Sequence, residues 1–119
     1  MIEQLIARVQ ATLNAAKMRH WRGPSYPQHM ILDRFIGDAN EALDDLVESF
    51  QGCHGPINFD AVPTIQRPRT DDVLAAIEAE MRWIASAREQ ISDDPAVLSL
   101  VDVLSIAYQR TVYLLRQQK

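Results

Sequence analysis

The sequence predicts an all-α fold in which four helices form a bundle with one long connection between the second and the third. Apolar residues recur at helical spacing along four segments, and glycine and proline separate the segments. One connection, residues 52–69, is much longer than the other two. The length of 119 residues fits one compact domain with one core, so we expect a single domain over residues 1–119.

The first two helices are expected over residues 2–21 and from about residue 26 or 28 to residue 50. In both segments apolar residues fall on one side, as in a helix that faces a core. Gly23 and Pro24 break the pattern between them. Gly52 is the expected C-terminal stop of the second helix.

The third helix is expected to start after Thr70, with that residue as N-cap and Asp71 and Asp72 in the first turn. The fourth helix is expected to start at Asp94 and Pro95, an N-cap followed by proline at the first helical position. Its first half is apolar nearly all round. Such a helix is either deeply buried or part of a subunit contact.

The long connection decides the topology. An extended chain covers about 3.3 Å per residue, so residues 52–69 can reach roughly 60 Å. The second helix, at about 1.5 Å per residue, is roughly 35 Å long. The link can therefore run the length of the bundle, which permits the up-down-down-up arrangement of ferritin-like folds with one crossover. The alternative is a floppy loop between ordinary up-down helices.

The composition favours a cytoplasmic protein. Twelve basic and sixteen acidic side chains give a net charge of −4, which argues against a generic electrostatic contact with nucleic acid. The single cysteine, Cys53, permits no internal disulfide and fits a reducing compartment. The N-terminal segment lacks the features of a signal peptide, and no run approaches the roughly 20 apolar residues of a membrane span. No membrane partner is expected.

A polar strip on the second helix is the main candidate for chemistry. At about 100° per residue, Asp33, Asp44 and Glu48 all fall within about 100° of His29. His20, at the end of the first helix, can point across the short turn toward the start of the second. Imidazole and carboxylate groups together suit iron, manganese or zinc. The simpler interpretation is a solvated acidic face.

The strip needs a second copy of the chain to form one site. Asp33 and Asp44 lie roughly 16 Å apart along the helix, so the two ends cannot share an ion within one chain. Two such helices packed antiparallel about residues 38–39 would bring them together, with two equivalent sites in each dimer. Gly37 and Asn40 lie at this expected interface. A glycine inside a helix costs about 1 kcal/mol relative to alanine, and a close helix crossing would explain it.

The spacing HW…H-x3-D-x10-D-x3-E resembles the ferritin-like DNA-protecting proteins of starved bacteria. The resemblance implies a homo-oligomer that binds iron between two subunits and oxidises it with peroxide or oxygen. The implied ligands are three groups of one subunit and two of its two-fold mate: His20, His29 and Asp33, with Asp44 and Glu48. It also implies that Trp21 absorbs a stray oxidising equivalent beside the site.

The chain also resembles a group of uncharacterised ferritin-like phage proteins. The shared patterns are H-W-x3-S-Y-x2-H at residues 20–29, Glu48 with Gly52, Asp102, and the pair Tyr113 and Leu114. This resemblance favours a different class, a metal-free helical scaffold that binds a host or virion protein. Asp102 itself is expected to make a solvent or interface contact, with a buried ion pair as the alternative.

Three departures from the DNA-protecting proteins limit the first resemblance. The turn between His20 and His29 is three residues shorter, and there is no basic N-terminal tail. The long link is proline-rich and offers no obvious short helix, so a cage is not expected to follow from the resemblance. The Glu-x-x-His motif of the di-iron carboxylate proteins is also absent from the sequence.

Overall fold

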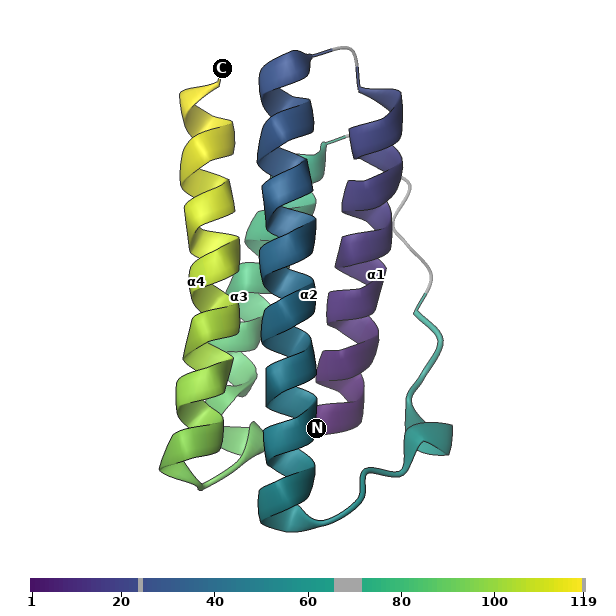
Figure 1. Cartoon of the computed structure of the whole chain (residues 1–119), viewed down its shortest axis with the longest axis vertical. Coiled ribbons are helices and arrows are strands. Elements are labelled where there is room, and N and C mark those ends of the chain that lie inside the picture. Colours follow the sequence, from purple (N-terminus) through teal and green to yellow (C-terminus); the bar gives the residue numbers. More distant parts are fainter. Residues whose placement is uncertain (24, 66–71, 119) are drawn as a thin grey trace.

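The computed structural model describes residues 1–23, 25–65 and 72–118. All regular secondary structure within these residues is helical. Four long helices lie side by side (Figure 1). The prediction of an all-α four-helix bundle is therefore confirmed. The elements in chain order are α1 (Ile2–Arg22), α2 (Tyr26–His54), the 3₁₀ turn η1 (Phe59–Ala61), α3 (Val73–Ile91) and α4 (Pro95–Gln117).

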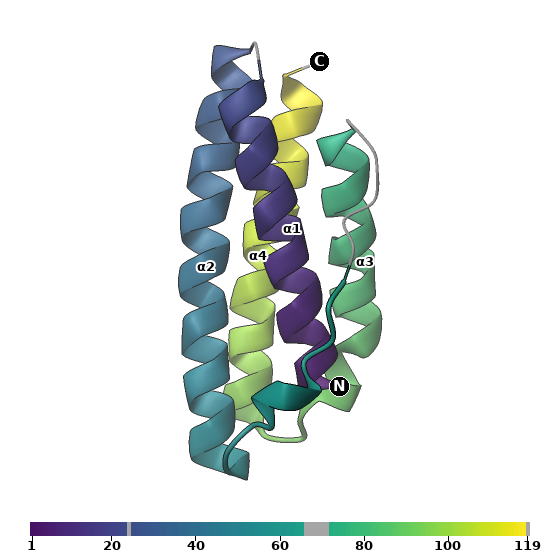
Figure 2. The same cartoon turned by 90° about the vertical axis from the view of Figure 1, so that its right-hand side faces the viewer.

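The helices form a ring in which every neighbour is antiparallel. Contacts join α1 to α2, α2 to α4, α4 to α3 and α3 to α1. α1 and α4 run in one direction and α2 and α3 in the other, so the last two are parallel (Figures 1 and 2). The link from α2 passes η1 beside the N-terminal end of α1 and follows the outside of the bundle toward the start of α3 (Figure 2). The up-down-down-up arrangement with one crossover is thus confirmed.

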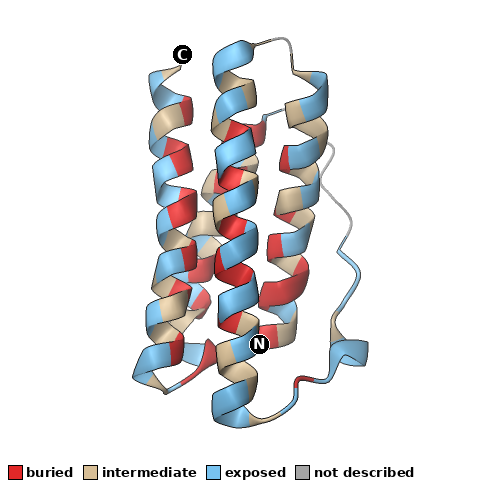
Figure 3. Ribbon diagram, viewed as in Figure 1, coloured by how far each residue is buried: buried red, intermediate tan, exposed pale blue. Residues whose placement is uncertain are grey.

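The core lies along the axis of the bundle. Buried residues occupy the inward faces of the helices, and the outward faces are exposed (Figure 3). An edge-to-face pair at the centre joins Phe35 of α2 to Tyr108 of α4, with ring centroids 5.0 Å apart. The largest fully buried side chains come from all four helices: Leu5, Val9, Leu32, Phe35, Leu46, Ile77, Ile84, Val97, Val101, Leu104 and Tyr108.

The starts of three helices are set by side-chain caps. Ser25 Oγ accepts a hydrogen bond from the Gln28 N–H of α2 at 3.3 Å and another from Nε2 of Gln118, the C-cap residue of α4, at 2.8 Å. Asp94 caps α4 ahead of Pro95, so this predicted start is confirmed. Capping satisfies backbone donors that the first turn leaves open. The second bond also fastens the last turn of α4 to the α1–α2 turn.

The start of α3 differs from the prediction. Its N-cap is Asp72, whose carboxylate accepts the Ala75 N–H at 3.0 Å, and the helix begins at Val73. The sequence places Asp72 inside the first turn instead, two residues after an N-cap at Thr70. Thr70, Asp71 and the turn residue Pro24 lie outside the described residues.

The predicted end of α2 was wrong. The helix continues through Gly52 to His54 and ends at Gly55, whose φ of 91° lies in the left-handed region. The Gly55 N–H donates to the Gln51 carbonyl at 2.9 Å. Cys53 and His54 therefore belong to the last helical turn. A helix end of this kind needs a residue with positive φ, and Gly55 supplies it at low steric cost.

Replacing Gly52 or Gly55 by alanine should change the free energy of unfolding in opposite directions. Nothing lies within 4 Å of a Cβ added at Gly52, so Gly52→Ala should raise the free energy of unfolding by about 0.5 kcal/mol. Gly55→Ala should lower it by about 1–2 kcal/mol, because its φ disfavours a side chain. Urea denaturation of both variants measures the difference. Equal effects would contradict the assignment of the helix end.

The link between α2 and α3 is partly anchored to the bundle. Ile57 is buried and Val62 packs against the core as a half-buried residue. η1, unexpected from the sequence, is a single turn that starts at Asn58, whose side chain accepts the Asp60 N–H at 3.2 Å. The described part of the link is therefore held in place along one side of α1.

α4 packs into the core on one side and exposes apolar side chains on the other. Val103 and Ile106 are 49 % and 48 % exposed, on the face that does not meet α2 or α3. By length and composition alone this helix could cross a membrane. A core helix of a bundle passes the same test, so this is weak evidence for a span. Of the two alternatives from the sequence, deep burial applies to the inward side of α4 only, and a subunit contact through its outward side stays a prediction.

Candidate metal centre

Two histidines are locked together at the α1–α2 turn. The rings of His20, near the end of α1, and His29, in the first turn of α2, are stacked with centroids 3.9 Å apart and planes inclined by 17°. His20 Nδ1 lies 3.0 Å from the His29 carbonyl oxygen, and His29 Nδ1 lies 3.1 Å from the His20 carbonyl oxygen. Each ring is therefore fixed by the backbone of the other residue.

These two hydrogen bonds determine which ring nitrogen of each histidine can bind an ion. A carbonyl oxygen can only accept a hydrogen bond, so each Nδ1 must carry a proton and donate. In the neutral imidazole the other nitrogen, Nε2, is then an unprotonated lone pair. Histidine ligands of metals are commonly held in this way, with a backbone carbonyl or carboxylate fixing the far nitrogen. His20 and His29 are thus prepared to offer Nε2 to an ion.

Asp33 lies close to one of these nitrogens. Its Oδ1 is 3.8 Å from His20 Nε2, which is beyond hydrogen-bond length. Metal–ligand distances of about 2.0–2.2 Å put two ligands of one ion up to about 4 Å apart, so the separation suits a shared ion. The carboxylate is exposed and is one helical turn beyond His29. The structure thus brings His20, His29 and Asp33 to one end of α2.

One chain alone does not complete a site. Among the described residues, His, Cys, Asp and Glu side chains form no group of three that could hold a metal ion. Asp44 and Glu48 lie far down α2 from the histidines, as their spacing in the helix requires. The two ends of the strip are therefore too far apart to share an ion within one chain, as the sequence predicts.

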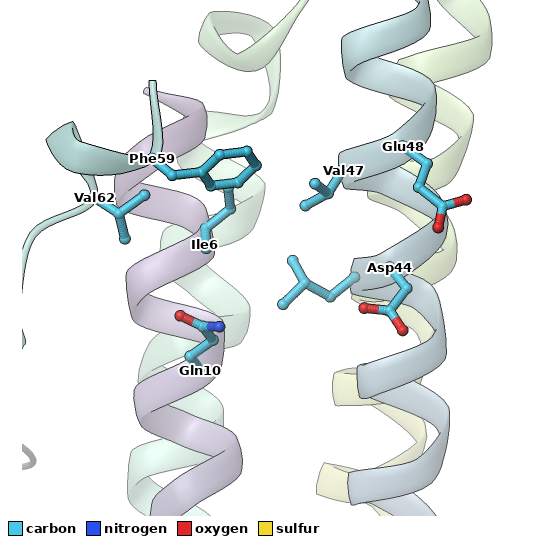
Figure 4. Close-up of a pocket in the computed structure, with 8 residues that line it drawn as sticks. Ile6, Gln10, Asp44, Val47, Glu48, Phe59 and Val62 are labelled. Carbon is cyan, nitrogen blue, oxygen red and sulfur yellow. The ribbon is translucent and has the colours of Figure 1, made fainter. Parts of the chain in front are cut away.

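Asp44 and Glu48 border a groove of about 400 Å³ between α1, α2 and the link. Figure 4 shows both carboxylates on the α2 side of the groove, with Gln10 across from them on α1. Neither carboxylate has a hydrogen bond or ion pair within the part of the chain that the structure describes. The rest of the lining is apolar: Ile6, Leu43, Val47, Phe59 and Val62.

Gly37 and Asn40 lie at a second hollow on the same face of the bundle. This hollow, of about 250 Å³, is also lined by Leu13, Asn14 and Lys17 of α1. A Cβ added at Gly37 would meet nothing within 4 Å. No packing within the described residues therefore requires a glycine here, in the middle of a long helix where glycine is unfavourable.

Charge is divided along this face. The last turn of α1 is basic and the distal half of α2 is acidic. The basic residues in or just before this turn are Lys17, Arg19 and Arg22, and the acidic ones on this face are Asp44 and Glu48. Two such faces arranged antiparallel would place opposite charges together.

Two exposed aromatic residues, Trp21 and Tyr26, belong to the helix ends that carry the histidine pair. Trp21 and Tyr26 are 70 % and 72 % exposed. The ammonium of Lys17 lies 5.6 Å from the centre of the Trp21 ring, and the Tyr26 ring is nearly parallel to His29 with centroids 6.3 Å apart. In the sequence Tyr26 is part of the shared motif at residues 20–29 without an assigned role, although its spacing of three residues from His29 on one helix indicates neighbouring side chains.

Asp102 is half exposed, as the expected solvent contact requires, and it also forms an ion pair that is only partly buried. It accepts two hydrogen bonds from Arg88 of α3, at 2.7 and 2.9 Å. These bonds hold the pKa of Asp102 below its usual value. This pair joins α3 to α4, far along the bundle from the histidine pair.

Comparison with known families places the chain in one of them. The model of a family of unknown function, DUF5856, matches residues 20–115, and the chain belongs to that family. Searches of curated proteins and of solved structures gave no match. The matched span begins at His20 and includes every candidate ligand.

Proposed function

We propose that this member of the DUF5856 family is a ferritin-like metal-binding protein whose site forms between two copies of the chain. The observation that carries the proposal is the mutual hydrogen bonding of His20 and His29, which leaves both Nε2 atoms free to bind. Asp33 beside them supplies an oxygen donor. Iron is the proposed ion, and zinc or manganese would accept the same donors. The protein would act as a cytoplasmic homodimer or larger homo-oligomer.

Antiparallel packing of α2 against α2 of a second copy completes the site. With the centre between residues 38 and 39, His29 faces Glu48 of the second copy and Asp33 faces its Asp44. Gly37 then faces Asn40, and the space around Gly37 allows a close approach. The unpartnered carboxylates of Asp44 and Glu48 and the division of charge along this face support the arrangement.

The proposed chemistry is the oxidation of ferrous iron as a substrate. Carboxylate oxygens favour the ferric ion, and imidazoles hold geometry while leaving positions open for an oxidant. The electron lost by each ferrous ion passes to oxygen or peroxide. Trp21, next to His20 in the chain and largely exposed, would intercept a stray oxidising equivalent.

An anaerobic ferrous titration followed by air tests the proposal. The wild type should show a rise in ferric absorbance above the buffer control. Asp44→Ala/Glu48→Ala should abolish the rise while circular dichroism shows a folded bundle, because both groups are exposed. Glu41→Ala/Asp45→Ala removes the same charge from exposed positions of α2 that are not proposed ligands, and it should keep the rise. A wild type without any rise, or identical curves for all three proteins, would reject ferrous oxidation.

A metal-free interaction protein is the second candidate. The exposed apolar side chains of Val103, Ile106 and Tyr113 on α4 favour it, since such a surface suits a protein partner. The resemblance to phage proteins points the same way, toward a host or virion partner. This candidate predicts no binding of Fe²⁺, Mn²⁺ or Zn²⁺ by calorimetry, so one set of titrations separates the two.

A further inference from the structure

The groove beside Asp44 and an exposed methionine on α2 indicate how two copies would interlock. We infer that Met30 of one copy enters the groove between α1, α2 and the link of a second copy. The inference rests on the proposed antiparallel pairing of α2, and it names a contact that the metal site itself does not require. By symmetry each dimer contains this contact twice.

The groove has the character of a receptor for an apolar side chain. Its volume of about 400 Å³ far exceeds what one side chain fills, and most of its lining is apolar. Phe59 of η1 points into it across from Val47 (Figure 4), yet it remains 52 % exposed. An aromatic side chain this exposed on a fastened link lacks a covering partner.

Met30 is the matching projection. It is 47 % exposed and lies one residue after His29, on the outward side of α2. In the proposed pairing Met30 faces Val47 of the second copy, which lines the groove. The same residue cannot reach the groove of its own chain, since 17 positions of helix separate Met30 and Val47 by roughly 26 Å. Methionine is unbranched and flexible, so it suits an irregular apolar recess.

The charges at the rim favour the same occupant. Asp44 and Glu48 border the groove without a cationic partner among the described residues. In the proposed pairing Lys17 and Arg19, near the C-terminal end of α1, approach this rim from the second copy. An apolar projection flanked by positive groups complements an apolar groove flanked by carboxylates.

Disulfide trapping tests the contact directly. In a Cys53→Ser background, which removes the exposed native thiol, Met30→Cys/Val47→Cys should form a covalent dimer with diamide. Diamide takes up the two thiol hydrogens as the sulfur–sulfur bond forms. Met30→Cys/Glu41→Cys is the matched control, because position 41 lies about 9 Å along the helix from position 47. Equal trapping of both pairs, or trapping of neither, would overturn the inference.

Association measured without cross-linking provides the second test. Met30→Glu should weaken dimerisation at least tenfold in analytical ultracentrifugation, because it places a charge in an apolar groove beside carboxylates. Met30→Leu should remain within about threefold of the wild type, since it keeps the apolar volume. A Met30→Glu protein that dimerises like the wild type would overturn the contact.

The two proposals fail separately. Disulfide trapping through Met30→Cys/Val47→Cys in a protein that binds no metal would support the Met30 contact and reject the metal function. A rise in ferric absorbance together with a Met30→Glu dimer as tight as the wild type would support the metal function and reject the Met30 contact. A wild type that stays monomeric with and without Mn²⁺ would reject both.

Discussion

Tyr108→Ala should lower the free energy of unfolding by about 3–5 kcal/mol, the usual cost of removing a buried aromatic side chain. Tyr108 is fully buried near the middle of α4 and packs edge to face on Phe35 of α2. Domains of this size are commonly stable by about 5–15 kcal/mol, so one substitution would remove a large part of the total. Chemical denaturation followed by circular dichroism measures the loss.

Tyr108→Phe should stay within about 1 kcal/mol of the wild type. The Tyr108 hydroxyl has no hydrogen-bond partner within the described part of the chain, so removing it leaves no group unsatisfied. Burial raises the pKa of this phenol, and the nearby Thr12 hydroxyl, which donates to the Arg8 carbonyl, offsets part of the rise. The group therefore stays neutral at ordinary pH. A loss comparable to that of alanine would mean that the hydroxyl is anchored.

Tyr113→Ala is the matched control for the alanine substitution. Tyr113 is on the same helix but exposed, so its removal should change the stability of the monomer by about 0.5 kcal/mol or less. A large loss there would show that the outward face of α4 is packed in solution, and would support the second candidate function.

Chain length and helical spacing were sufficient to predict the topology. The 18 residues of the link, positions 52–69, can span the bundle, whereas the α1–α2 and α3–α4 connections are too short for anything but antiparallel neighbours. Local sequence patterns also predicted a helix end correctly where only one residue suits the capping position. The N-cap Asp94 followed by Pro95 is such a case.

Element ends were harder to predict where two residues could fill the same role. Gly52 and Gly55 are both acceptable stops, and only the backbone shows that Gly55 has the positive φ. Asp72 is preceded by two other good N-cap residues, so sequence alone did not favour it. In both cases the decision depends on how the link leaves the bundle, which is a tertiary property.

The sequence names the candidate ligands, but it does not give the arrangement of the two histidines. Helical spacing correctly separated the pair His29 and Asp33 from the pair Asp44 and Glu48. The stacking of His20 on His29 and the exchange of carbonyl hydrogen bonds depend on the exact path of the short turn. Periodicity contains no information about that path.

Asp33→Asn should strengthen dimerisation without metal and abolish its response to metal. In the proposed pairing Asp33 faces Asp44 of the second copy, and symmetry repeats this contact. Two like charges about 4 Å apart repel by about 1 kcal/mol in water and more near a protein surface. Two contacts therefore oppose association by about 2 kcal/mol, which corresponds to roughly a 30-fold weaker dimer.

A divalent cation between the two carboxylates reverses this effect in the wild type. An ion that binds only the dimer must tighten dimerisation by the free energy of its own binding. Sedimentation of the wild type in EDTA and in Mn²⁺ should therefore give a tighter dimer with the ion. Asp33→Asn should dimerise about 10–30-fold more tightly than the wild type in EDTA, and nearly equally in both solutions.

The opposite directions of these two effects make the prediction specific. Asp45→Asn also removes one exposed carboxylate from α2, but position 45 lies outside the proposed pairing face. It should leave the dissociation constant of the dimer unchanged both in EDTA and in Mn²⁺. Salt at 1 M should shrink the advantage of Asp33→Asn in EDTA, because screening weakens repulsion between exposed charges. If Asp33→Asn instead weakens the metal-free dimer, Asp33 does not face an acid across the interface, and the proposed register of the two α2 helices is wrong.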